Sequence, residues 1–170
     1  MKHYEKAISN FYTSLQFNPI PLLSWDFSLS NFGNFCKYQK DIDILDAIAT
    51  KNRWTLQPHF KQELQEKEQI IVVTDATLKI VHATKNIFDM NGYTLNEILG
   101  KRPKMFQGKD TDKNTIAAIS KAVKNKMPFE ARVLNYRKDG SEYWCDIKAQ
   151  PLFNGKGKVV NFIAYEREVA

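Results

Sequence analysis

The sequence has few of the residues that define several common classes of protein. It contains two cysteines, Cys36 and Cys145, which form neither a metal-spaced pair nor a disulfide framework. Seven glycines and six prolines in 170 residues exclude a collagen-like or low-complexity chain. No uninterrupted apolar run approaches the roughly 20 residues that cross a bilayer, and the start lacks the apolar core of a secretory signal. We therefore expect a cytoplasmic protein with no membrane partner.

What is present suits a folded domain. Hydrophobic residues make up 43% of the chain and charged residues 26%, the balance of a soluble globular protein. A chain of this length has room for one ordinary domain and a small additional layer. It can bury enough surface to fold without disulfides.

The excess of positive charge is local. The chain carries a formal net charge of +6, and residues 100–126 contain eight basic side chains against Asp110 and Asp112 alone. Such a segment could attract phosphate or nucleic acid. A solvated loop and helix surface is the more ordinary explanation, and nucleic acid is not the favoured partner.

The first 67 residues are expected to be helices and loops. Apolar residues at helical spacing predict an amphipathic helix over 3–16. The segment 18–35 mixes Pro, Ser, Asn and Gly with aromatics, which predicts a loop that packs against the domain. Two further helices are predicted, one over 41–50 and one from Pro58 to about Glu68.

From Ile70 onward the pattern changes to strands. Strands are predicted over 70–75 and 79–83, and short helices over 84–91 and 94–99, the second opened by a Thr94–Glu97 capping box. A longer helix begins at Thr111 or Asp112 and ends near Lys124. Three strands follow, near 128–137, 142–152 and 157–168, with a strong hairpin signal at Asp139–Gly140. This order predicts an α+β fold with an antiparallel sheet and its helices between strands two and three.

Five stretches carry a family resemblance: IIVVTD, NGYTLNEILG, QGKDTD, NYRKDGSEYW and KVVNFIAYERE. In this order and spacing they resemble a PAS domain, most closely its light-oxygen-voltage (LOV) branch. The resemblance implies a PAS fold, with a five-stranded antiparallel sheet that encloses a small-molecule pocket. It divides the chain into an N-terminal helical extension, residues 1–67, and a LOV-like PAS domain, residues 68–170.

Flavin-binding members of the family form an adduct between the flavin and a cysteine. The resemblance places that cysteine at Pro103, which has no nucleophile, and the asparagine before it at Arg102. Gln107 and Asn135 match the family's flavin contacts, and Lys104 keeps one basic position. The remaining contacts are replaced: Ser120 stands where the resemblance has an arginine, Cys145 where it has an asparagine, and Glu166 where it has a glutamine. These differences argue against flavin, and the absence of histidine from 111–126 argues against haem, so the cofactor is left unknown.

Strand alternation and the resemblance together predict a mainly apolar pocket with a few polar groups. Its predicted lining is Val72, Thr74, Gln107, Ile116, Ile119, Asn135, Cys145, Ile147, Phe162 and Glu166. Glu166 is the unusual member, because a buried carboxylate is costly unless it is paired or protonated. It either hydrogen-bonds or exchanges a proton with a ligand, or it is satisfied by water, by Lys104 or by a backbone amide.

The opposite face of the predicted sheet is unusually apolar and indicates an interface. Its predicted members are Leu134, Tyr136, Trp144, Val159, Ile163 and Tyr165. The family commonly uses this face for dimers and flanking helices. We expect a homodimer and expect residues 3–16 to cover part of the face.

The sequence therefore predicts a non-catalytic PAS sensory module that binds a ligand or a partner signalling protein. Cys145, His82 and Glu166 could be written as a catalytic trio, but no oxyanion hole or motif accompanies them. Two alternatives stay open: a cysteine-less flavin photoreceptor or redox sensor, and a regulator that contacts nucleic acid through residues 100–126. The chain ends soon after its last strand, so we expect no output domain within it.

Overall fold

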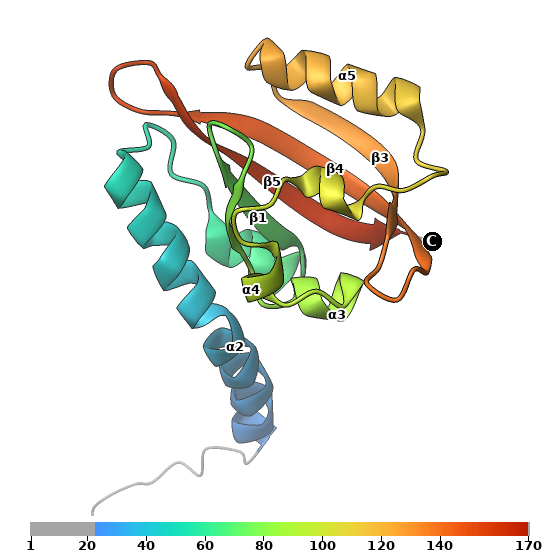
Figure 1. Ribbon diagram of the computed structural model, residues 1–170. Coiled ribbons are helices and arrows are strands. Elements are labelled where there is room, and N and C mark those ends of the chain that lie inside the picture. The colour runs from blue at the N-terminus through green and yellow to red at the C-terminus, as the bar shows by residue number, and fades with distance from the viewer. Residues whose placement is uncertain (1–22, 170) are drawn as a thin grey trace, which may run out of the picture. The chain divides into compact units, whose positions relative to one another are not determined.

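The computed structural model describes residues 23–169, and their side chains over 38–64 and 67–169 (Figure 1). The chain divides into two compact units, residues 1–34 and residues 35–170. The sheet and the helices around it all belong to the second unit. The predicted helix over 3–16 lies outside the described residues.

The N-terminal part of the structure differs from the prediction. Helix α2 runs from Leu23 to Asn52, so the predicted loop over 18–35 is wrong from Leu23 onward, and the predicted helix over 41–50 is the last part of α2. No proline falls between Pro21 and Pro58, so the backbone hydrogen bonds of a helix can form without interruption. Gly33, inside α2, weakens a helix by only about 1 kcal/mol.

The helix predicted from Pro58 to Glu68 is shorter than expected. It contains the π-helical turn η1, Gln62–Glu66, and ends at Lys67. Glu68 adopts a φ angle of 51°, in the left-handed region, which stops the helix before β1 begins at Ile70.

The five strands form one antiparallel sheet, as predicted. They are β1 (Ile70–Asp75), β2 (Ile80–Ala83), β3 (Phe129–Tyr136), β4 (Glu142–Phe153) and β5 (Val159–Val169), in the order β2-β1-β5-β4-β3. The hairpin predicted at Asp139–Gly140 joins β3 to β4, and Gly140 has the positive φ angle, 87°, that this turn needs. β5 lies at the centre and pairs with both β1 and β4.

The helices lie between β2 and β3 in the chain, which confirms the α+β arrangement. They are α3 (Ile87–Asn91), α4 (Leu95–Ile98), the 3-10 turn η2 (Pro103–Phe106) and α5 (Lys113–Lys124). The predicted capping box opens α4, where the Glu97 carboxylate accepts a hydrogen bond from the Thr94 backbone N–H at 2.9 Å. Asp112 caps α5 by accepting from the backbone N–H groups of Asn114 and Thr115.

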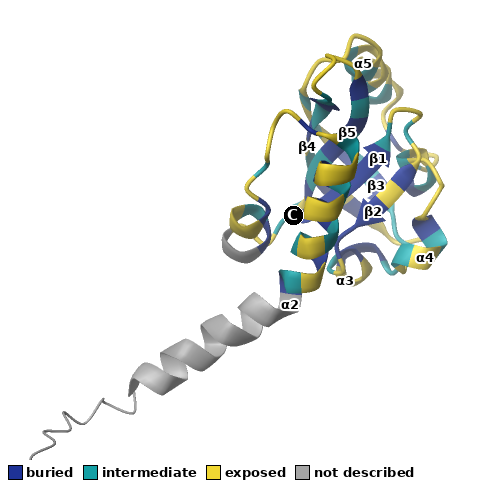
Figure 2. Cartoon of the chain, turned by 90° about the vertical axis from the view of Figure 1, so that its left-hand side faces the viewer, coloured by how far each residue is buried: buried dark blue, intermediate teal, exposed yellow. Residues whose placement is uncertain are grey.

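Apolar side chains gather in two clusters. One contains α2 residues such as Leu45 together with Ile71, Val73 and Ile163, and we call this side of the sheet the outer face. The other contains Val72 and Cys145 with side chains of α3, α4 and η2, and we call this side the inner face. In Figure 2 the exposed residues of α2 point away from the sheet. Among residues 23–169, no helix is long and apolar enough to cross a membrane.

Candidate ligand cavity

A cavity of about 500 Å³ lies on the inner face of the sheet. Six of the seven predicted pocket residues on strands line it: Val72, Thr74, Asn135, Ile147, Phe162 and Glu166. Its volume is within the range of roughly 300–1,000 Å³ that is usual for small-molecule sites. The antiparallel register explains the convergence, because alternate residues of neighbouring strands share one face.

Helix α5 closes the cavity without filling it. Ile116, Ile119 and Val123 lie one turn apart along the helix and all line the cavity. None of the α5 residues is fully buried, although these three form its apolar side. An apolar stripe that remains half-buried faces open space, and this space is what a ligand would occupy.

Polar groups reach the cavity from three directions. Thr74 comes from β1, Asn135 from β3, and Gln107 from the residue that follows η2. The hydroxyl oxygen of Thr74 is buried and has no hydrogen-bond partner in the part of the chain that the structure describes. A buried hydroxyl without a partner costs free energy, so a ligand that satisfies Thr74 would recover it.

Glu166, on β5, is the acidic residue of the cavity lining. Glu166 is 5% exposed, and the Cys145 thiol lies 3.9 Å from its carboxylate. Burial raises the pKa of Glu166 to about 7, because the surrounding medium disfavours the charged form. Glu166 therefore changes its protonation state in the physiological range of pH.

The structure brings nine of the ten predicted pocket residues around this cavity. The exception is Cys145, which is fully buried and does not line the cavity. Its thiol packs in the inner-face cluster below the wall, and burial raises its pKa. Whether the nine lining residues bind a ligand stays a prediction.

Several lining residues were missed by the sequence reasoning. Ala149 and Ala164 lie on the inward face that strand alternation predicts, although they were left out of the predicted lining, and Val123 could have been found from its helical spacing to Ile116 and Ile119. Leu78 and Phe106 belong to loops and turns, where periodicity gives no signal.

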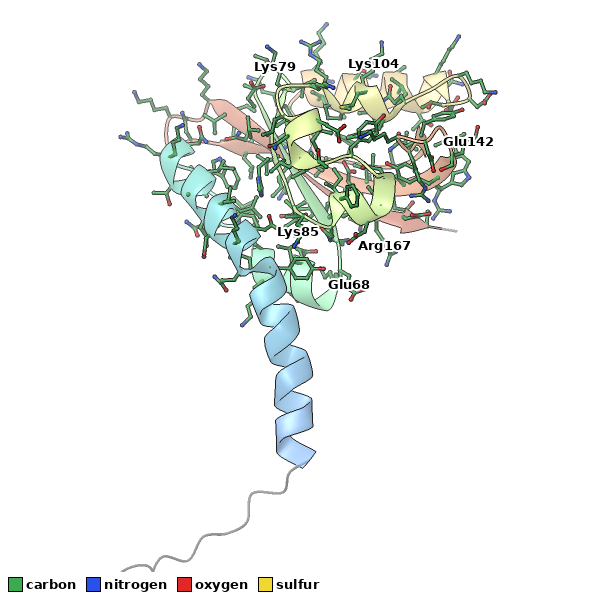
Figure 3. The ribbon with its side chains drawn as sticks, turned by 60° about the horizontal axis from the view of Figure 1, so that its bottom comes forward. Glu68, Lys79, Lys85, Lys104, Glu142 and Arg167 are labelled. Atoms are coloured by element: carbon green, nitrogen blue, oxygen red, sulfur yellow. The ribbon has the colours of Figure 1, made fainter. Side chains whose placement is uncertain are left out.

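The mouth of the cavity is basic. Arg102, Lys104 and Lys124 line it, and all three are exposed (Lys104 is labelled in Figure 3). They are part of the basic segment 100–126. The turn η2, the residue before it and the end of α5 thus bring part of this charge to one opening of the cavity.

The lining does not fit a flavin that forms a cysteine adduct. Pro103, at the position where the resemblance places the reactive cysteine, lines the cavity and has no nucleophilic atom. Glu166 places a carboxyl group where the resemblance has an amide. The function proposed below therefore uses no flavin chemistry.

The residues of the suggested catalytic trio are not assembled. His82 pairs with Val73 of β1, on the outer face, whereas Cys145 and Glu166 belong to the inner face. The His82 imidazole instead lies 3.5 Å from the carboxylate of Asp41, on α2. That carboxylate also accepts a hydrogen bond from the backbone N–H of Lys85 at 3.0 Å. No sequence motif indicates this link between α2 and the sheet.

The predicted interface on the outer face is partly covered by the chain itself. Ile163 and Val159 are buried, and Ile163 packs in the cluster that contains Leu45 of α2 and Trp54. Tyr165 packs against the same cluster. α2 and the segment after it therefore occupy this part of the face, and the predicted cover, residues 3–16, lies outside the described residues.

Tyr136 is also held within the chain. Its hydroxyl donates to the Asp110 carboxylate at 2.9 Å and accepts from the Asp110 backbone N–H at 3.1 Å. Its ring lies against Gly108, where an added Cβ would come within 2.3 Å of it. Trp144 remains 45% exposed, opposite the half-buried Leu134.

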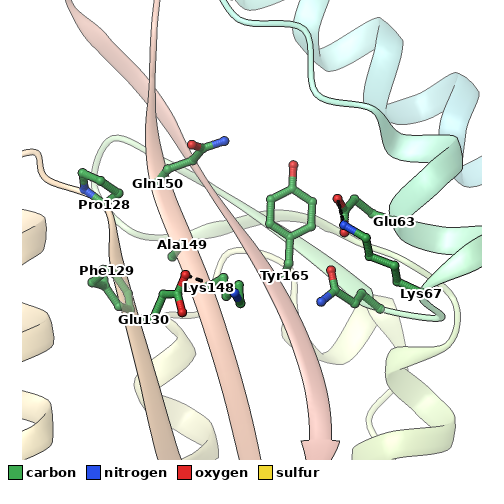
Figure 4. A pocket seen from close by; sticks show the side chains of 10 residues that line it. Glu63, Lys67, Pro128, Phe129, Glu130, Lys148, Ala149, Gln150 and Tyr165 are labelled. Atoms are coloured by element: carbon green, nitrogen blue, oxygen red, sulfur yellow. Dashed lines mark hydrogen bonds and ion pairs between the residues drawn. The ribbon is translucent and has the colours of Figure 1, made fainter.

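A hollow of about 710 Å³ lies beside this region, between η1 and strands β3 to β5 (Figure 4). Tyr165 and Gln150 line it, together with the ion pairs Lys67–Glu63 and Lys148–Glu130. Its lining is more polar than that of the inner-face cavity and carries paired charges. We regard it as the uncovered part of the outer face.

The sheet order, the helices between β2 and β3 and the inner-face cavity together define a small sensory domain of the PAS type. A family model described as "PAS domain" matches residues 68–170. The chain belongs to the PAS domain family.

Its relatives are of the LOV type. The chain is 38% identical to phototropin-2 of Oryza sativa over 120 residues, which is 66% of this chain and 13% of that protein. It is 35% identical to Protein TWIN LOV 1 of Arabidopsis thaliana over 119 residues, 67% of this chain and 29% of that protein. The chain thus spans less than a third of either relative.

Solved structures agree with these sequence matches. A LOV domain studied with a flavin analogue aligns with a TM-score of 0.62 at 30% identity, covering 67% of this chain and 87% of that chain. The dark structure of the Aureochrome1 LOV domain aligns with a TM-score of 0.61 at 30% identity, covering 68% and 86%. The protein is LOV-like in fold and in sequence.

Proposed function

We propose that this chain is a non-catalytic sensory module that binds a small molecule in its inner-face cavity and reports occupancy through α2. Residues 68–170 act as the sensor domain, and residues 1–67 act as the extension that passes the signal to a partner protein. The observation that carries the proposal is a cavity of about 500 Å³ lined by Thr74, whose buried hydroxyl has no hydrogen-bond partner among the described residues.

Strand β5 provides the route from the cavity to α2. Phe162, Ala164 and Glu166 line the cavity, whereas Ile163, between them, lies under α2 and packs with Leu45. Because successive residues of a strand point to opposite faces, a shift of β5 toward a ligand also moves its outer-face side chains. The Asp41–His82 contact is a second point at which a movement of the sheet would be transmitted to α2.

The proposal is tested by filling the cavity. Ala164→Met adds a long side chain to the cavity wall, and Ala118→Met makes the same change at an exposed position of α5. N-phenyl-1-naphthylamine, a neutral fluorescent probe, should bind the full chain saturably with one site. Binding should fall at least tenfold in Ala164→Met and stay unchanged in Ala118→Met.

Coupling to α2 is read by hydrogen exchange of residues 38–52 with and without the probe. We expect slower exchange of these amides in the probe complex. A probe that binds both variants equally, or that leaves the exchange of α2 unchanged, contradicts the proposal.

We also propose that the chain forms a homodimer through the exposed part of the outer face around Trp144. Trp144 supports this, because it is a large exposed apolar side chain on a sheet face. Trp144→Ser should lower the mass measured by light scattering to that of a monomer. Phe88→Ser, a matched change at a residue that is 53% exposed on α3, should leave the mass unchanged. A monomeric wild-type chain refutes the dimer.

A further inference from the structure

The carboxyl group of Glu166 has no cationic partner among the described residues. In the register of the sheet Glu166 lies opposite Ile70 of β1 and Ile147 of β4, and both are apolar. Its hydrogen-bond partner in the described part of the chain is the Cys145 thiol, at 3.9 Å. A thiol is a weak donor and carries no compensating positive charge.

The other charged and titratable groups around the cavity do not supply that charge. Arg102 and Lys104 come from η2 and the residue before it, and Lys124 comes from the end of α5. All three are exposed at the mouth, and none forms an ion pair with Glu166 within the described residues. Tyr143 and Cys145, on β4, are neutral at physiological pH, since burial raises the pKa of each.

A buried carboxylate without a cation is expensive, and a partner that enters the cavity can remove the cost. The raised pKa of Glu166 is the sign of this cost, because burial alone holds the proton on the group. A ligand cation would stabilise the charged form through a short, charge-assisted hydrogen bond. An anionic group at the same place would meet a carboxylate and be repelled.

The difference from the LOV pattern points the same way. The resemblance puts a glutamine at position 166, and an amide offers a ligand both a donor and an acceptor. An ionised glutamate offers acceptors alone. This site therefore favours a ligand edge that is rich in donors.

We propose that the cavity selects a molecule with an apolar body of ring-like size that carries a cationic nitrogen group, and that this group pairs with Glu166. The inference rests on the proposed ligand-sensing function and names the class of ligand for the same cavity. Ile116, Ile119 and Phe162 supply the apolar walls for the body of the molecule. The basic side chains at the mouth are solvated, so water and salt screen their repulsion of the cation.

Three probes with one body and different charge test the inference. 2-Naphthamidine is cationic, 2-naphthamide is neutral and 2-naphthoate is anionic, and all share the same fused rings. Titration calorimetry with the full chain at pH 8 should show 2-naphthamidine binding at least tenfold more tightly than 2-naphthamide. 2-Naphthoate should bind most weakly of the three.

Variants identify the group responsible. Glu166→Gln keeps the shape of the side chain and should abolish the preference for 2-naphthamidine over 2-naphthamide. Glu130→Gln removes the same charge from an exposed position of β3 and should leave the preference intact. The melting temperature of each variant shows that it has folded.

The pH dependence of probe binding to the wild-type chain is a second test of the inference that needs no variant. The preference for 2-naphthamidine should grow as pH rises from 6 to 8, since Glu166 loses its proton while the amidine keeps its own. A preference that does not change over this range overturns the inference.

The remaining outcomes separate the inference from the proposed function. Equal binding of the three probes, a preference for 2-naphthoate, or a preference that survives in Glu166→Gln overturns the inference. If N-phenyl-1-naphthylamine still binds in a manner sensitive to Ala164→Met, the sensory function stands with another class of ligand. If neither the neutral probe nor 2-naphthamidine binds, both proposals fail.

Discussion

The two faces of the sheet are built from the same strands, yet one is packed and the other is hollow. On the outer face, Leu45 and Ile163 meet with no exposed surface. On the inner face, α5 turns Ile116 and Ile119 toward a cavity of about 500 Å³. The difference separates two tasks, since dense packing holds α2 on the sheet and open space receives a small molecule.

The contrast also concerns polar groups. On the outer face the Trp54 indole N–H donates to the Asn161 side-chain oxygen at 2.9 Å, and the Asn161 amide donates to the Thr74 backbone carbonyl. The Thr74 hydroxyl on the inner face has no hydrogen-bond partner among the described residues, whereas the buried His82 imidazole on the outer face lies 3.5 Å from the Asp41 carboxylate. The unpartnered Thr74 hydroxyl costs free energy, as expected of a site prepared for a ligand.

The largest expected change in the free energy of unfolding comes from shortening one apolar side chain on each face. Ile163→Ala should lower the free energy of unfolding by about 4 kcal/mol, because it opens a void in a closed core. Ile147→Ala should cost about 2 kcal/mol, because its side chain already borders open space. Urea unfolding followed by circular dichroism measures both, and equal losses would show that the inner face is as well packed as the outer.

The second effect concerns the buried acid. The pKa of Glu166 is about 7 in the folded chain against an ordinary value of 4.5, so the folded chain binds more protons between these two pH values. The free energy of unfolding should therefore fall as pH rises through this window, by about 3 kcal/mol. Glu166→Gln should remove this contribution, so that the variant gains stability over the wild type as pH rises from 4.5 to 7.

Urea titrations of the two proteins at matched pH values give the difference directly, and common contributions from other groups cancel. A constant difference across the window would show that Glu166 is solvated in the folded state.

The third effect tests how α2 is held. Asp41→Ala removes the acceptor for Lys85 and the partner of His82, and should cost about 2 kcal/mol. Asp46→Ala changes an exposed residue of the same helix and should cost almost nothing. If the two variants unfold at the same urea concentration, the Asp41 contact does not fasten α2 to the sheet.

The smallest expected change in the free energy of unfolding concerns Tyr136, at the end of β3. Gly108→Ala pushes a methyl group into the ring of Tyr136, which can swing outward, at a cost of about 1 kcal/mol. The Tyr136–Asp110 hydrogen bonds should be lost with this movement. Since burial and the hydrogen bond to the Asp110 carboxylate raise the pKa of Tyr136 to about 12, the variant should ionise at lower pH in an ultraviolet absorbance titration. An unchanged titration would mean that the ring stays in place.

The sequence predicted the sheet and the cavity better than the N-terminal region. Alternation in β4 and β5 placed Ile147, Phe162 and Glu166 on one face because period two follows directly from strand geometry. The helix after Leu23 was missed because glycine, serine and asparagine are typical of loops, although they do not prevent a helix. Cys145 was assigned to the lining because alternation gives the face of a residue, not whether neighbouring side chains cover it.

The outer face shows a further limit of sequence reasoning. Ile163 was predicted to belong to an apolar surface at an interface. The side chains that pack in one cluster with it, Leu45 of α2 and Trp54, lie about 100 residues earlier in the chain, and no local pattern joins such distant segments.

The position of β5 between β1 and β4 restricts how such a domain could acquire a new ligand in evolution. From Asn161 to Glu166 its residues alternate between the two faces by odd and even number. Inserting or deleting a single codon here would send Glu166 beneath α2 and Tyr165 into the cavity, exchanging both faces at once. Descendants of this gene would therefore change what they sense by point substitution within β5, and would keep its length.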